Sequence, residues 1–119
     1  MADKRSARIN DQFRREIGEI IQYHVKDPGI SKGMASVVRV EVTRDLSHAK
    51  VFLSVMGTER EKREVFKAVE RAGGFIRSEL GSRVRIRRVP ELHFILDDSI
   101  EYAVNMAQKI DEVIGTDDE

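Results

Sequence analysis

The stretch that decides the fold is VFKAVERAGGFIRSELGSRVRIRRVP, residues 65–90. Apolar side chains recur in it at helical spacing, and they keep their phase on both sides of Gly73 and Gly74. Each of these glycines costs a helix about 1 kcal/mol relative to alanine. The pattern therefore predicts two short helices that meet at a kink and rest on one core. The apolar stripe consists of Val65, Val69, Ala72, Ile76 and Leu80.

The chain on the N-terminal side of this stretch predicts one amphipathic helix and a β-hairpin. The helix ends before Asp27, because the residue before a proline avoids helical backbone angles and a glycine follows. Alternating apolar and polar residues indicate two strands, and the short polar connection between them fits a hairpin although it contains Leu46. The predicted elements are a helix from Ser6 or Asn10 to Val25, strands at 34–43 and 49–55, and a turn at 44–48.

The remaining patterns predict three helices and one strand. Thr58 and Glu61 fit a capping box at the start of the first helix, and Gly81 is placed to end the second. Pro90 has no backbone donor, so the strand that contains it lies at a sheet edge or carries a bulge there. The sequence DDS at 97–99 is expected to cap a last helix. The predicted elements are helices from 58 to the kink, at 75–80 and at 97–114, and a strand at 84–96.

This order of elements assigns the chain to the α+β class. Its 119 residues and 40% hydrophobic content suffice for one domain with a modest core. Helices alone would not need a hairpin, and a parallel α/β sheet would need more regular alternation. We therefore expect helices on one face of a three-stranded mixed sheet, an extra C-terminal helix, and a short acidic tail at 116–119.

Composition excludes several kinds of site. The chain has no cysteine, which excludes disulfides, thiolate metal sites and cysteine nucleophiles. The start, MADKRSAR, has no apolar segment of the kind found in signal peptides. No stretch approaches the roughly 18 apolar residues of a membrane helix. We therefore expect a soluble cytoplasmic protein.

The net charge of zero conceals an uneven distribution. Residues 71–90 carry six Arg against one Glu, a net charge of +5, and residues 91–119 carry one Lys against nine acids, a net charge of −8. Residues 1–26 and 27–70 carry +2 and +1. A basic patch beside an acidic end indicates a polyanionic partner such as nucleic acid. The acidic end then either faces away from this partner or serves only solubility.

Chemistry-bearing residues do not converge in the sequence. His24, His48 and His93 are expected on a helix end, a turn and a strand, with no metal-ligand spacing among them. The carboxylates at 97–98 precede a serine, which favours a helix cap. The glycine pair at 73–74 lacks the lysine and hydroxyl of a phosphate-binding loop. We therefore expect no catalytic residue, no metal site and no cofactor.

RNA binding has a physical basis at the kink. If the apolar stripe faces the core, Gly74 lies opposite it and exposes backbone that a phosphate can approach. The first amides of the following helix lack partners and carry the positive end of its dipole. Arg71 and Arg77 flank the kink, and further arginines alternate along the predicted strand and so share one face. The candidate RNA-binding residues are Lys4, Arg5, Arg8, Arg15, Arg71, Gly73, Gly74, Arg77, Arg83, Arg85, Arg87 and Arg88, and the kink is assigned to Ala72, Gly73 and Gly74.

A second interpretation of the same stretch is structural. In it, two helices pack tightly at the glycines and the arginines are merely solvated. Base stacking has little support, because there is no Trp and Phe52, Phe66, Phe75 and Phe94 fit the core. If the chain binds RNA, recognition of a structured RNA by its backbone and shape fits better than sequence reading.

The order and spacing of five fragments resemble a known family, the bacterial ribosome-binding factor A family of small-subunit assembly factors. Each fragment alone is weak, whereas all five in register at the family's spacing are specific. The fragments are KDP at 26–28, RDL at 44–46 with AKV at 49–51, AGGFIR at 72–77, VPEL at 89–92, and Phe94 with Asp97 and Ser99.

The resemblance implies a type II KH-like domain, over residues 1–115, in which an Ala-x-Gly kink replaces the usual GxxG loop. It implies a monomeric, non-catalytic factor that binds the 30S subunit and its 16S rRNA, rather than mature 70S ribosomes. Binding would occur during late maturation near the 5′-terminal helix, with a role in cold adaptation. Three alternatives stay open: a general KH-type RNA-binding module, a protein-interaction module that docks on an acidic partner, and an enzyme with an unrecognised site.

Overall fold

The computed structural model describes residues 4–30 and 35–97 of the 119-residue chain. The helix predicted after Asp97, the acidic tail and Met34 of the first predicted strand lie outside these residues. The elements are α1 (Lys4–Glu19), the π-helix η1 (Ile20–His24), β1 (Ala35–Val42), β2 (His48–Val55), α2 (Glu59–Arg71), α3 (Gly73–Arg83) and β3 (Glu91–Leu96).

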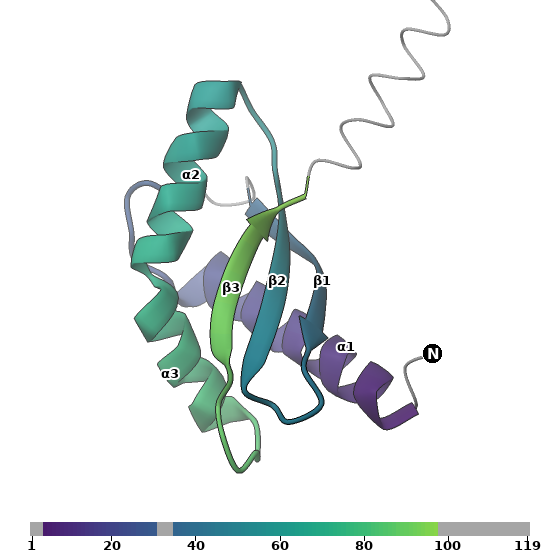
Figure 1. Ribbon diagram of the computed structural model, residues 1–119. Helices are drawn as coiled ribbons and strands as arrows, with labels where there is room; N and C mark the ends of the chain where they lie inside the picture. Colours follow the sequence, from purple (N-terminus) through teal and green to yellow (C-terminus); the bar gives the residue numbers. More distant parts are fainter. Residues whose placement is uncertain (1–3, 31–34, 98–119) are drawn as a thin grey trace, which may run out of the picture.

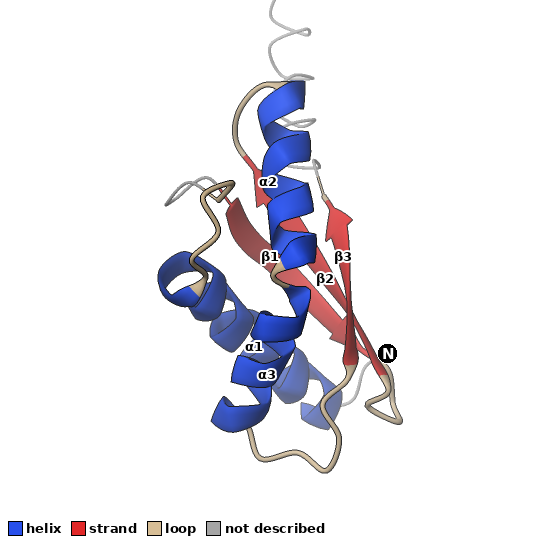
Figure 2. Cartoon of the chain, turned by 90° about the vertical axis from the view of Figure 1, so that its left-hand side faces the viewer, coloured by secondary structure: helices blue, strands red, loops and turns tan. Residues whose placement is uncertain are grey.

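The three strands form a mixed sheet in the order β1-β2-β3. β1 pairs antiparallel with β2, and β3 pairs parallel with β2, which makes β3 an edge of the described sheet. In Figure 1, α1 lies behind the sheet while α2 and α3 run along its β3 edge. Figure 2 shows that the three helices share one side of the sheet. The predicted α+β arrangement is confirmed.

One hydrophobic core lies between the helices and the covered face of the sheet. Phe13 and Ile17 of α1 belong to the same buried cluster as Val51 and Leu53 of β2. The apolar stripe read across the kink is buried as predicted, with Ala72 half-buried at its centre. Among the described residues, no helix is both long and apolar enough to cross a membrane.

The first helix ends in a wider turn than its pattern predicts. Its last turn is the π-helix η1, where Val25 N donates to Ile20 O at 3.1 Å. Ile20 and Ile21 of this turn are both buried. The apolar spacing locates the helix but gives no sign of this local widening.

The predicted hairpin is present, with one shift in register. A bulge between Val37 and Arg39 of β1 places Val37 and Val40 on the core side, so apolar and polar residues do not alternate regularly along β1 as predicted. In the turn, Asp45 Oδ1 accepts from Ser47 N at 3.1 Å and from Ser47 Oγ at 2.6 Å. These bonds lower the pKa of the Asp45 carboxyl to about 2.

The capping box at the start of α2 is confirmed. Thr58 Oγ1 accepts from Glu61 N at 3.2 Å, and Glu61 Oε1 accepts from Thr58 N at 2.9 Å. The predicted end of the next helix is wrong, because α3 continues through Gly81 to Arg83. Gly81 serves packing instead, since a Cβ there would lie 2.9 Å from Val89 Cγ2.

The strand predicted at 84–96 is only half present. Residues 84–90 form a loop, and β3 begins at Glu91, directly after Pro90. Proline has no donor for a ladder, and the carbonyls of Val89 and Pro90 are taken by Arg77. The arginines of this loop therefore do not alternate along a strand face, which corrects that part of the prediction.

Candidate nucleic-acid interface

The kink lies at Ala72. α2 ends at Arg71, Ala72 has φ −82° and ψ 0°, and α3 begins at Gly73. The Ala72 amide donates to Ala68 O at 3.1 Å, and its carbonyl accepts from Ile76 N at 2.9 Å. The predicted junction of two helices is confirmed, and the residue at its centre keeps both backbone hydrogen bonds.

The two glycines after Ala72 have different surroundings. A Cβ on Gly73 would lie 3.5 Å from Phe94 Cε2, an ordinary contact distance, whereas a Cβ on Gly74 would meet nothing within 4 Å. Neither glycine has a positive φ. Tight packing therefore does not account for Gly74, whose backbone is open to solvent at the start of α3.

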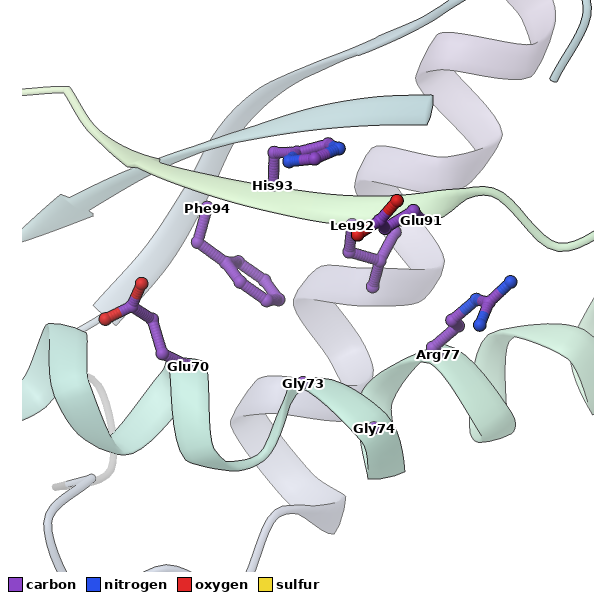
Figure 3. A pocket seen from close by; sticks show the side chains of 8 residues that line it. All are labelled: Glu70, Gly73, Gly74, Arg77, Glu91, Leu92, His93 and Phe94. Atoms are coloured by element: carbon purple, nitrogen blue, oxygen red, sulfur yellow. The ribbon is translucent and has the colours of Figure 1, made fainter. Parts of the chain in front are cut away.

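A groove of about 410 Å³ lies between the kink and the edge strand β3. Figure 3 shows Phe94 pointing from β3 toward the kink, while His93 points to the other side of the strand. The groove carries two carboxylates, Glu70 and Glu91, against one guanidinium, that of Arg77. It is therefore not uniformly basic. Its lining residues are Glu70, Gly73, Gly74, Arg77, Glu91, Leu92, His93 and Phe94.

Arg77 connects α3 to the loop at 84–90. Its Nε donates to Pro90 O at 3.1 Å, and its Nη2 donates to Val89 O at 2.8 Å. Because both acceptors are neutral carbonyls, the guanidinium retains its positive charge beside the kink.

Three arginines project from this loop. Arg85, Arg87 and Arg88 are exposed, and none of them has an ion-pair partner among residues 4–30 and 35–97. Their loop is anchored by Val84 and Pro90, which are buried. The loop is therefore anchored at both ends and presents three arginines without ion-pair partners in the described part of the chain. It is the most positively charged feature of the described surface.

Arg83 is engaged within the fold. Its Nη1 lies 3.1 Å from Glu16 Oε2 and 3.3 Å from Glu19 Oε1, which ties α3 to α1. The hydrogen bond to Glu16 raises the pKa of Arg83. Because two carboxylates lie at its guanidinium, Arg83 serves mainly to hold α3 against α1. It offers less positive charge to a phosphate than the loop arginines do.

Arg71 is also paired. Its Nε and Nη2 lie 3.2 and 3.1 Å from the two carboxylate oxygens of Asp27, so α2 is joined to the turn after η1. The Arg71 hydrogen bond, followed by one from the Gly29 amide, holds the pKa of Asp27 below its usual value. The Arg71 side chain is nevertheless 60% exposed.

The candidate cations of α1 lie on the solvent side of the helix where they are described. Arg8 is exposed, and Arg15 is exposed with Nε 3.4 Å from Asp11 Oδ2. Lys4 and Arg5 fall in α1, but their side chains lie outside the described part.

Among the predicted site residues, the structure brings Gly73, Gly74, Arg71 and Arg77 together at the kink. The loop arginines are joined to this group through Arg77.

Two of the aromatic residues expected in the core lie outside it. Phe52 does not belong to the buried cluster, and the Arg39 guanidinium covers its ring, with Cζ 3.8 Å from the ring centroid. Phe75, directly after Gly74, is 44% exposed. It borders a groove that also includes His24, Lys26 and Arg71. The sequence carries the signal, because Phe75 lies one position off the apolar stripe that contains Ile76.

Two histidines expected to be unrelated are in contact. His48 Nδ1 lies 2.9 Å from His93 Nε2, and Glu91 is beside them. Their contact depends on the parallel register of β2 and β3, which pairs His48 with Glu91 and Lys50 with His93. No spacing in the sequence reveals this register, since two helices separate the strands.

The chain matches a known protein family over most of its length. The family model described as ribosome-binding factor A matches residues 5–110. The chain belongs to the ribosome-binding factor A family. A family member from Staphylococcus carnosus is 48% identical over 113 residues, which cover 95% of this chain and 96% of the relative.

Solved structures of the ribosome-binding factor A family agree with the fold. The crystal structure of the Thermus thermophilus member has a TM-score of 0.66 at 28% identity and covers 76% of this chain and 94% of that chain. Coordinates of the Thermus thermophilus factor fitted into the cryo-EM map of a 30S complex have a TM-score of 0.60 at 28% identity, and they cover 75% and 91%. The described element order is consistent with the KH-like domain implied by the resemblance.

Proposed function

We propose that this chain is a non-catalytic factor that binds the 30S subunit through its 16S rRNA during late maturation, near the 5′-terminal helix. It acts as a cytoplasmic monomer, and mature 70S ribosomes are not its main target. Membership of the ribosome-binding factor A family supports the ribosomal partner. So does the Thermus thermophilus relative, whose coordinates were fitted into the map of a 30S complex. A role in cold adaptation belongs to the same proposal and rests on the family resemblance alone.

The observation that carries the proposal is the open backbone at Gly74. A glycine inside a helix costs about 1 kcal/mol relative to alanine, and here no neighbouring atom requires it. Close approach by a partner from outside is a physical reason to keep it. A phosphate at this point would meet the first amides of α3, which lack partners within their own helix.

The surrounding charges define the direction of approach. Glu70 repels a phosphate from the groove on the β3 side of the kink. Arg85, Arg87 and Arg88 attract it to the loop. RNA backbone therefore contacts the outer side of the kink and the loop 84–90, with Arg77 contributing charge between them. Arg71 and the α1 cations are secondary contacts, since several of them are paired. Arg83, which is held by two carboxylates, lies outside this contact surface.

Such a factor would act by differential affinity. It stabilises whichever rRNA conformation exposes its site, and it leaves when the mature fold removes that site. No proton transfer or covalent step is required. The protein would hold a folding intermediate of the subunit rather than change it chemically.

The proposal is tested by titrating immature 30S particles at increasing salt. Counterion release predicts that log affinity falls linearly with log salt, by about 0.7 to 0.9 for each phosphate neutralised. A flat response would overturn rRNA binding and favour docking on a protein partner. Cosedimentation with purified 30S, 50S and 70S particles should show association mainly with 30S, and equal binding to all three would favour a general RNA-binding module.

A further inference from the structure

The open face of the sheet carries a compact cluster of three potential metal ligands. His48 begins β2, and Glu91 and His93 lie two positions apart on β3. Because β2 and β3 are parallel and His48 pairs with Glu91, all three side chains leave the same face. Each side chain is exposed, and their ligand atoms all lie within 4.8 Å of one another.

We propose that His48, Glu91 and His93 form a surface site for a divalent transition-metal ion of the zinc class. The ligand type supports this class, because imidazole nitrogens suit zinc, copper and nickel, whereas magnesium and calcium prefer oxygen ligands. Three protein ligands leave a fourth position for water, as in open zinc sites.

The distances are close to those that such an ion requires. Zinc binds imidazole nitrogen at about 2.0–2.1 Å, so two ligands at tetrahedral positions lie about 3.4 Å apart. His48 Nδ1 is 2.9 Å from His93 Nε2 and 3.6 Å from Glu91 Oε2. These two separations bracket the tetrahedral edge. The ligand atoms of His93 and Glu91 lie within 4.8 Å of each other, so rotation of these two side chains has to close their separation by up to about 1.4 Å to complete the site.

The hydrogen bond between the two rings defines the change that binding requires. In that bond one ring nitrogen donates and the other accepts. Both nitrogens must present lone pairs to a metal, so the shared proton moves to solvent or to the distal nitrogen of its ring. Glu91 supplies the negative charge that an imidazole pair lacks, while the nearby Lys50 ammonium opposes a cation. Glu41 lies opposite Lys50 in the strand register and adds a further negative charge to this face.

The test uses the untagged full-length chain freed of metal with a chelator. Calorimetric titration with Zn²⁺ should show saturable binding at one ion per chain, and Mg²⁺ at the same concentration should show none. His48→Gln and His93→Gln should each weaken Zn²⁺ binding by at least about tenfold. His24→Gln is the matched control, because His24 is exposed on η1 outside the cluster, and it should bind as the parent does.

A second readout locates the ion. In NMR spectra, Zn²⁺ should shift the ring signals of His48 and His93 and leave those of His24 unchanged. Equal Zn²⁺ affinity in His93→Gln and His24→Gln, or the absence of saturable binding in the parent, would overturn the proposal. Thermal melts of each variant without metal verify that the substitutions leave the fold intact.

Discussion

The Arg77 guanidinium of α3 donates from Nε to Pro90 O at 3.1 Å, and this bond holds the residue directly before β3. A second bond from Nη2 to Val89 O at 2.8 Å completes the attachment. Since both acceptors are neutral, Arg77 fixes the arginine-bearing loop without losing its charge. Its structural and electrostatic contributions can therefore be separated by substitution.

Arg77→Lys and Arg77→Gln make that separation. Both remove the forked donor geometry, so both should lower the free energy of unfolding, by about 1–3 kcal/mol in urea titrations. Only Arg77→Gln removes the charge, and only it should reduce the salt slope of 30S binding, by about 0.7 to 0.9. An equal loss of slope in the lysine variant would contradict a direct electrostatic contribution from Arg77.

The loop arginines should contribute most to the salt dependence of binding. Replacing Arg85, Arg87 and Arg88 by Gln should reduce the slope of log affinity against log salt by about 2 to 3, with no loss of thermal stability. The matched control replaces three exposed cations of α2, namely Arg60, Arg63 and Lys67, by Gln. If both triple variants lose the same slope, binding depends on overall charge and not on this loop.

Arg83 should behave in the opposite way. Arg83→Gln leaves Glu16 and Glu19 without their common cation, so the connection between α3 and α1 weakens. We expect a lower Tm by circular dichroism and an unchanged salt slope of 30S binding, because the guanidinium is already neutralised. A variant with full stability and reduced slope would place Arg83 among the RNA contacts.

Patterns among neighbouring residues predict most of the fold. The features that they do not predict depend on contacts between residues far apart in the chain. The capping box at Thr58 and the meeting of two helices at the kink depend on neighbouring residues, and both are confirmed. The kink is shorter than predicted, because α3 already begins at Gly73 and only Ala72 lies between the helices. The extent of α3 and the loop before β3 depend on contacts of Arg77 and Gly81 with residues eight or more positions away. The same reason explains why the contact between His48 and His93 was not foreseen.

The candidate site also combines features set by neighbouring residues with features set by distant contacts. The exposure of Gly74 was correctly deduced from the phase of the apolar stripe. The ion pairs that neutralise Arg71 and Arg83 join residues 44 and 67 positions apart, and charge counting along the chain does not detect such pairs. The basic surface is therefore narrower than the sequence indicates, and it is concentrated on the loop.

The hairpin turn should contribute a measurable acid sensitivity. The pKa of Asp45 is lowered to about 2 from an ordinary value of 3.8 by hydrogen bonds from Ser47 and Thr43. A lowered folded-state pKa contributes stability that is present above about pH 4 and is lost as pH falls toward about 2. Asp45→Asn should therefore lower the Tm at neutral pH and reduce the fall of Tm across that window. An NMR titration that gives Asp45 a pKa near 3.8 would contradict this account.

Gly74 provides the most direct separation of stability from function. Because a Cβ there meets nothing within 4 Å, Gly74→Ala should stabilise the protein by about 0.5–1 kcal/mol through better helix propensity. If RNA backbone approaches this position, the same methyl group should weaken 30S binding, and Gly74→Glu should weaken it further by adding bulk and negative charge.

The control is Ser78→Ala, a substitution at an exposed position of the same helix, which should leave 30S binding unaltered. Urea unfolding and cosedimentation measure the two effects. A more stable Gly74→Ala variant with undiminished 30S affinity would show that RNA does not touch the kink.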